Sequence, residues 1–134
     1  MGDTIDDGTG GLSGRVIGAA ITVHRHLGPG ALERAYELCL DAELRHLGIE
    51  AERQVSVGLH YRDVDLPRAY RIDLLVERQL VVEIKVVSKL RAVHLAQVQT
   101  YLRLTDTRVG LLFNFHVGAL VDGGFRRILR ASTR

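Results

Sequence analysis

The stretch YRIDLLVERQLVVEIK at residues 70–85 decides the fold, because it contains two apolar segments separated by the polar residues 77–79. Alternating and β-branched apolar residues over such short segments predict two strands joined by a tight turn. The first strand carries Asp73, and the second carries Glu83 and Lys85. A hairpin of these strands brings two acids and one amine together from separate positions in the sequence.

The apolar pattern also predicts the register of this hairpin. A two-residue loop would set Ile72 opposite Glu83 and would place a charge among apolar side chains. A three-residue loop sets these pairs opposite each other: Val76 and Leu80, Leu74 and Val82, Ile72 and Ile84, Asp73 and Glu83, and Arg71 and Lys85. A slip by one residue would turn every side chain to the other face. The pattern therefore favours the pairing in which the acids meet, although the loop lacks the glycine that such turns usually contain.

The rest of the chain predicts an α/β fold with a mixed sheet flanked by helices. We expect helices at 15–27, 31–47 and 89–104, strands at 54–61, 70–76, 80–87, 109–115 and 125–129, a connection at 63–67, and Ser88 as the cap of the third helix. The crossover through the third helix predicts that the strands on either side of it are parallel.

Composition indicates one globular domain. The chain has 134 residues, of which 46% are hydrophobic and 25% charged, and no apolar run approaches the roughly 20 residues that cross a bilayer. We expect residues 1–13 to form a disordered tail without the features of a secretion signal, and residues 14–134 to form the domain. The single Cys39 is expected to be a buried, unreactive thiol, which fits a cytoplasmic protein. A net charge of +2 permits nucleic-acid binding without arguing for it.

The acidic residues suit a metal and phosphate site, because magnesium prefers oxygen ligands and keeps several waters. Asp73, Glu83 and Glu33 supply carboxylates, and Lys85 supplies an amine. Structural alternatives exist: the strand acids can form a polar sheet face, Lys85 can simply form an ion pair, and Glu33 can interact with a helix dipole. We favour a site, because unpaired acids are costly in a sheet that helices cover.

A family resemblance rests on several motifs in order. Gly30, Glu33 and Tyr36 follow HRHLGP at 24–29, and they precede the Asp73 segment, the Glu83-x-Lys85 segment, HLAQ at 94–97 and YL at 101–102. Over residues 16–130 the chain resembles the GxxExxY protein family, a small branch of the PD-(D/E)XK nuclease-like superfamily. Each motif is weak alone, and their joint order and spacing make the resemblance specific.

The resemblance implies a restriction-endonuclease-like αβββαβ core that hydrolyses phosphodiesters with Mg²⁺ or Mn²⁺. The catalytic residues that it implies are Glu33, Asp73, Glu83, Lys85 and Gln97. The expected metal ligands are Asp73, Glu83, the backbone carbonyl of Ile84, and Glu33. Ile72 stands where the superfamily nominally has proline, at a position that varies within it. Tyr36 and Tyr101 are expected to be core rings.

The expected function is that of a metal-dependent nuclease-like domain acting on nucleic acid, with DNA as the expected partner. Arg71, Lys89 and Arg91 are expected to contact it. Two alternatives stay open: a weakly active or inactive nucleic-acid-binding or regulatory module, and a structural protein that forms a homodimer through its sheet edge. The short chain leaves little to grip a duplex, which favours a homodimer or a recruited protein partner.

Overall fold

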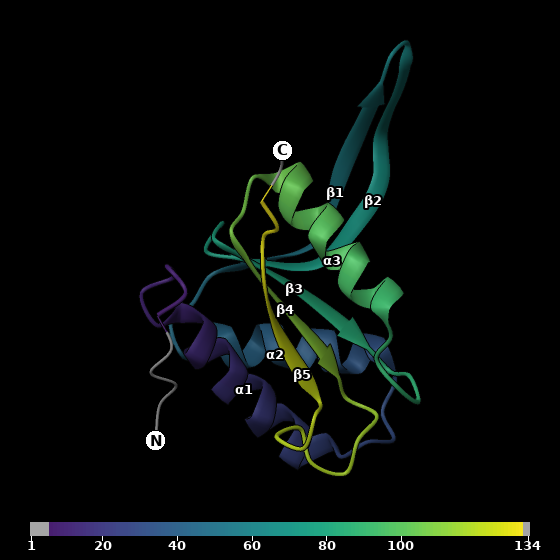
Figure 1. The fold of residues 1–134 in the computed structure, drawn as a ribbon. Coiled ribbons are helices and arrows are strands. Elements are labelled where there is room, and N and C mark those ends of the chain that lie inside the picture. The colour runs from purple at the N-terminus through teal and green to yellow at the C-terminus, as the bar shows by residue number, and fades with distance from the viewer. Residues whose placement is uncertain (1–5, 133–134) are drawn as a thin grey trace.

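The computed structural model describes residues 6–132 and shows an α/β fold with one mixed sheet (Figure 1). Its elements in chain order are α1 (Leu12–Leu27), α2 (Glu33–His46), β1 (Ala51–Tyr61), β2 (Val64–Val76), β3 (Leu80–Lys85), α3 (Ala92–Thr105), β4 (Val109–Asn114) and β5 (Phe125–Leu129). The run from α2 to β4 has the αβββαβ order that the resemblance implied. Within the described residues, no helix is long and apolar enough to cross a membrane.

The five strands follow chain order across the sheet, from β1 at one edge to β5 at the other. β3 and β4 are parallel, as predicted from the crossover through α3, and the other neighbouring pairs are antiparallel. β3 is therefore a central strand, and its residues from Leu80 to Ile84 are all buried. This places the Glu83 position in the interior of the protein.

Helices cover both faces of the sheet. The face under α1 and α2 buries a large apolar cluster that includes Val16, Tyr36, Leu40, Leu74, Val82, Ile84 and Phe113. The face under α3 buries a smaller cluster that includes Ile72, Val81, Val98, Tyr101 and Leu112. α3 lies very close to β4 at Gly110, where an added Cβ would stand 2.6 Å from a methyl group of Val98.

The turn between β2 and β3 confirms the predicted three-residue loop. Val76 pairs with Leu80, and the ladder continues in the predicted register to the pair of Leu74 and Val82. Glu77 and Arg78 adopt left-handed backbone with φ of 52° and 54°, so non-glycine residues take the strained positions. Glu50, the residue just before β1, holds this turn in place. The N–H of Glu77 donates to the Glu50 carbonyl at 2.9 Å, and the Glu50 N–H donates to the Glu77 carboxylate at 2.6 Å.

Beyond Leu74 the two strands separate, and this corrects part of the prediction. The ladder stops before three expected pairs: Asp73 with Glu83, Ile72 with Ile84, and Arg71 with Lys85. In the same segment β2 remains paired with β1, where Arg71 lies opposite Ser56. The split between β2 and β3 leaves backbone groups of β3 free for other partners at this end of the sheet.

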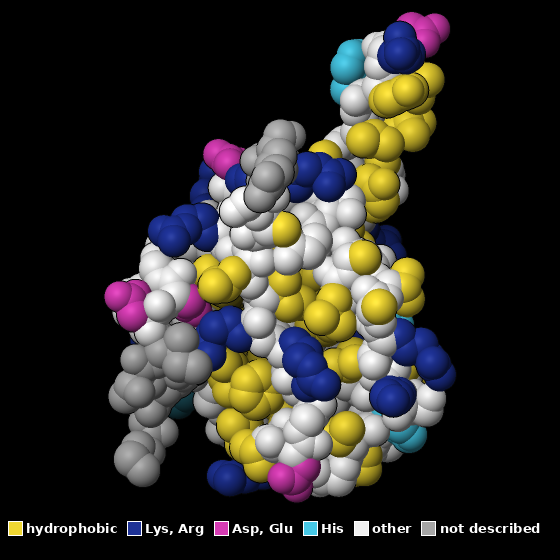
Figure 2. Space-filling view, viewed as in Figure 1, with side chains coloured by type: hydrophobic (Ala, Val, Ile, Leu, Met, Phe, Trp, Pro, Cys, Tyr) yellow, Lys and Arg dark blue, Asp and Glu magenta, His cyan; other side chains and the backbone are white. Residues whose placement is uncertain are grey.

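β1 and β2 extend past the sheet as a two-stranded arm (Figure 1), which the sequence analysis did not predict. The expected connection at 63–67 is wrong, because Val64 and Pro67 belong to β2. The register shifts between Val57 and Leu59, opposite the part of β2 that contains Pro67, and such irregularities accommodate proline. Apolar side chains are exposed along the arm (Figure 2), including Tyr61, Val64 and Leu66.

The structure corrects three other local predictions. The tail does not extend through residue 13, because Asp7, Thr9 and Ser13 are buried and α1 begins at Leu12; residues 1–5 lie outside the described part of the chain. Ser88 does not cap the third helix, which begins at Ala92. Cys39 is exposed rather than buried.

Candidate active site

The candidate site lies at the end of the sheet where β2 and β3 separate. Asp73 of β2 reaches across this split, and its Oδ2 accepts a hydrogen bond from the backbone N–H of Ile84 in β3 at 2.8 Å. The carboxylate thus takes the place of a strand–strand backbone bond. This contact orients Asp73 toward the strand that carries Glu83 and Lys85.

Glu83 is a buried acid with an incomplete set of partners. It is only 4% exposed, and its Oε2 lies 3.2 Å from the Nζ of Lys85. Its other oxygen, Oε1, has no hydrogen-bond partner among the described residues. Leaving a buried carboxylate oxygen without a donor costs free energy, so the site is arranged in a way that favours an additional positive or donating group.

Asp73 and Glu83 lie near enough for the charge of Asp73 to affect the pKa of Glu83. Burial and the repulsion of the Asp73 carboxylate together raise the pKa of Glu83 to about 8, against the opposite effect of Lys85. Two neighbouring carboxylates repel each other when both are ionised, and a divalent cation between them would relieve this repulsion.

Glu33 lies at the start of α2, near this pair. Its side chain is largely in solvent, but partial burial and the nearby Asp73 raise its pKa, with Lys85 acting in the opposite direction. Within residues 6–132, no three Asp, Glu, His or Cys side chains are arranged to hold a metal ion by themselves. The closely associated acids are therefore Asp73 and Glu83, with Glu33 farther out.

α3 contributes Gln97 and Tyr101, which are one helical turn apart. Tyr101 is buried, and burial together with the charges of Glu83 and Asp73 raises its pKa to about 12, against the effect of a hydrogen bond from Gln97. Tyr101 is thus a core ring, as predicted, whose hydroxyl also faces the acids. The position of this hydroxyl near the acids was not predicted from the sequence, although the spacing of four residues from Gln97 was a usable indication.

Two further polar residues near the site were not predicted from the sequence. Gln54 of β1 places its side-chain nitrogen 3.5 Å from Oδ1 of Asp73, and the same nitrogen donates a hydrogen bond to Glu37 of α2. Glu37 is buried and also forms an ion pair with Arg53 at 3.2 Å. Residues 54 and 37 carry no motif that sequence inspection alone would single out.

The three basic residues predicted to contact nucleic acid all lie at the surface. Arg71 belongs to β2, and Lys89 lies in the segment between β3 and α3. Arg91 is the residue that precedes α3, and its N–H donates to the Nδ1 of His94 at 2.9 Å. Their exposure leaves them accessible to an anionic polymer.

Comparison with known proteins identifies the family of this chain. A family model described as the PD-(D/E)XK nuclease superfamily matches residues 11–128, which include every element of the fold from α1 to β5 apart from the last residue of β5. No curated protein and no solved structure gives a significant match. Since the family model spans nearly the whole chain, the protein belongs to the PD-(D/E)XK nuclease superfamily.

Proposed function

We propose that this protein is a metal-dependent nuclease that hydrolyses phosphodiester bonds of nucleic acid, with DNA as the substrate. The observation that carries the proposal is the buried Oε1 of Glu83, which has no donor in the described part of the chain and lies in an acid pair with Asp73. An acid pair with a purely structural role would be expected to have donors for both oxygens. A bound cation would supply the missing partner of Glu83 Oε1.

The residues present fit a hard divalent cation. Asp73 and Glu83 would hold Mg²⁺ or Mn²⁺ directly, the carbonyl of Ile84 would add a neutral oxygen, and Glu33 would bind through water. Such a cation supplies polarisation of the scissile phosphate and a lower pKa for the attacking water. The mutual repulsion of the two acids is relieved when a positive charge lies between them.

The remaining residues of the site would act on the phosphate and the water. Lys85 is held beside Glu83 by their ion pair, so its ammonium group is placed to neutralise charge that develops on phosphate oxygens. Gln97 would orient water or a ligand through its amide. Arg71, Lys89 and Arg91 would contact flanking phosphates, which is the sequence-independent part of nucleic-acid binding.

The test is a cleavage assay with the full chain. Single- and double-stranded DNA and RNA are incubated with the protein in Mg²⁺, in Mn²⁺ or in chelator, together with Asp73→Ala and with Asp122→Asn as a matched control at an exposed acid. We expect cleavage of DNA that requires metal and is lost only in Asp73→Ala. Metal-dependent cleavage of RNA alone would change the substrate assignment. If the protein cleaved none of these polymers, the proposal that it is a hydrolase would be contradicted.

A further inference from the structure

Gln54 has a backbone conformation that its position in a strand does not explain. Its φ is 55°, in the left-handed region, although it lies inside β1. The other non-glycine residues with positive φ in the described part of the chain lie in turns or at a helix end: Arg62, Glu77, Arg78 and Asp106. Such strain persists only where the surrounding structure imposes it, and it is concentrated at functional sites.

The strained backbone directs the Gln54 side chain to a buried acid. The side-chain nitrogen of Gln54 donates to Oε1 of Glu37, and Arg53 donates to Oε2 of the same carboxylate at 3.2 Å. Glu37 is 4% exposed and lies on α2, one turn after Glu33. Both oxygens of this acid therefore have donors, and Glu37 serves as a fixed anchor for the amide of Gln54.

The same amide nitrogen faces Asp73 from the side opposite to β3. It lies 3.5 Å from Oδ1 of Asp73, while the N–H of Ile84 lies 2.8 Å from Oδ2. Each oxygen of the Asp73 carboxylate thus has one neutral donor, from two different strands. Two donors at opposite oxygens define the plane of a carboxylate and leave its remaining lone pairs available.

We propose that Gln54, anchored by Glu37, is a positioning residue that orients the Asp73 carboxylate for binding a divalent cation. The inference rests on the proposed function, since it assumes that Asp73 is a metal ligand. Groups that hydrogen-bond to metal ligands fix their orientation, and their loss commonly weakens metal binding by about 10- to 100-fold. A neutral amide serves this role without adding charge next to the acids.

The conformation of Gln54 provides a test that separates positioning from stability. Both Gln54→Gly and Gln54→Leu lose the hydrogen bond to Glu37, but glycine tolerates φ of 55° without strain, so Gln54→Gly should melt at the same temperature as Gln54→Leu or higher. It also removes the amide, so its Mn²⁺ dissociation constant should rise by about 10-fold or more. Gln54→Leu should lose the same affinity, and Gln79→Leu, at an exposed turn position, is the matched control that should retain it.

The experiment measures Mn²⁺ affinity by calorimetry and melting temperature in chelator, both on the full chain. A readout without metal is the side-chain amide resonance of Gln54, which should shift in Asp73→Asn. Affinities within twofold of the parent in both Gln54 variants, with binding lost in Asp73→Ala, would overturn the positioning role alone. The positioning role would also be overturned if the loss of Mn²⁺ affinity in Gln54→Gly were no larger than its unfolded fraction explains. No Mn²⁺ binding by the parent, or unchanged binding in Asp73→Ala, would overturn the proposed function itself.

Discussion

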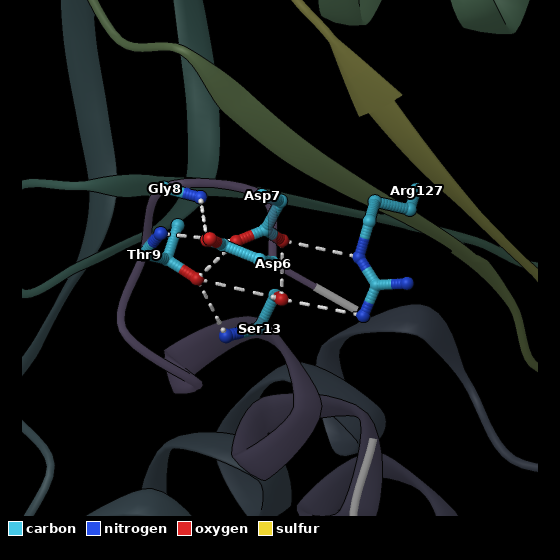
Figure 3. Close-up of polar contacts among 6 residues, drawn as sticks. All are labelled: Asp6, Asp7, Gly8, Thr9, Ser13 and Arg127. Carbon is cyan, nitrogen blue, oxygen red and sulfur yellow. Dashed lines mark hydrogen bonds and ion pairs between the residues drawn. The ribbon is translucent and has the colours of Figure 1, made fainter. Parts of the chain in front are cut away.

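Two buried carboxylates in this protein have opposite surroundings. Asp7 lies in a cluster with Thr9, Ser13 and Arg127, and Figure 3 shows these side chains converging on it. The Thr9 N–H and hydroxyl donate to Oδ1 at 3.0 and 2.5 Å, while the Ser13 hydroxyl and the Arg127 guanidinium, at 3.1 Å, donate to Oδ2. Glu83 is similarly buried, yet one of its oxygens has no such donor.

The pKa shifts of these acids differ in direction because burial raises the pKa of both and only Asp7 has partners that outweigh burial. Burial by itself would raise the pKa of Asp7, but the hydrogen bonds from Ser13 and Thr9 and the charge of Arg127 outweigh it and lower the pKa. At Glu83, burial and the neighbouring Asp73 outweigh Lys85, and the pKa rises to about 8. We infer that the satisfied acid joins the N-terminal segment to β5, whereas the unsatisfied acid belongs to a binding site.

The largest expected effect is on cleavage. Asp73→Ala or Glu83→Gln should lower the metal-dependent rate by at least about 100-fold, because each removes charge that holds the cation and the reacting phosphate. Single-turnover cleavage of DNA measures the rate, and circular dichroism checks that the variants are folded. A rate within a factor of ten of the parent in both variants would remove the distinction between the two acids.

The next effect is on stability. Asp7→Ala should lower the free energy of unfolding by about 3 kcal/mol, because it removes the buried carboxylate that accepts hydrogen bonds from Thr9, Ser13 and Arg127. Urea denaturation measures this loss, and the neighbouring exposed Asp6→Ala serves as the control. The folded variant should cleave DNA at the parental rate. A rate loss that exceeds the unfolded fraction would mean that the Asp7 cluster is part of the functional site.

A third variant should affect both properties together. Gly110→Ala places a Cβ 2.6 Å from Val98, so α3 must move away from the sheet, at a cost of about 1 to 3 kcal/mol. Because α3 also carries Gln97 and Tyr101, we expect slower cleavage in the folded fraction. Denaturation and cleavage measured on one preparation test this. Unchanged stability would show that the α3–β4 contact is looser than the structure indicates.

The smallest effect is a difference in pH dependence without metal. The pKa of Glu83 is raised above its unfolded value, so its stabilising contribution is complete below about pH 4.5 and is lost as the pH rises toward about 8. The pKa of Asp7 is lowered, so its contribution is present at neutral pH and is lost as the pH falls below about 4. Each slope is at most about 1.4 kcal/mol per pH unit.

Denaturation in chelator across this pH range measures both slopes. Glu83→Gln should flatten the alkaline decline, and Asp7→Asn should flatten the acid one. If Glu83→Gln left the alkaline decline unchanged, the raised pKa of Glu83 would not be its cause. If Asp7→Asn left the acid decline unchanged, the Asp7 cluster would not contribute to it.

The sequence predicted the part of the site that depends on apolar alternation. The register of β2 and β3 followed from side chains that must face the core, and it carried Asp73 and Glu83 to the same end of the sheet. The point where the strands separate was not predictable, because it involves the side chain of Asp73 in place of a backbone bond. The left-handed conformation of Gln54 was not predictable either, because glutamine, unlike glycine, does not indicate a positive φ.

Long-range polar contacts explain the other failures. The N-terminal segment has the composition of a tail, and its order depends on Arg127, which lies 120 positions away from Asp7. The arm was missed because Pro67 resembles a connection when the irregular pairing around it is not visible. Cys39 is next to Leu40 in sequence, and only the phase of α2 decides that Leu40 faces the core.

Anomalous diffraction from crystals of the full chain soaked in Mn²⁺ tests the central claim most directly, because it locates the cation relative to both buried acids. The account predicts one strong peak bounded by the carboxylates of Asp73 and Glu83 and none beside Asp7. Absence of a peak at the Asp73–Glu83 pair in an accessible crystal form, or a peak at the Asp7 cluster instead, would contradict it.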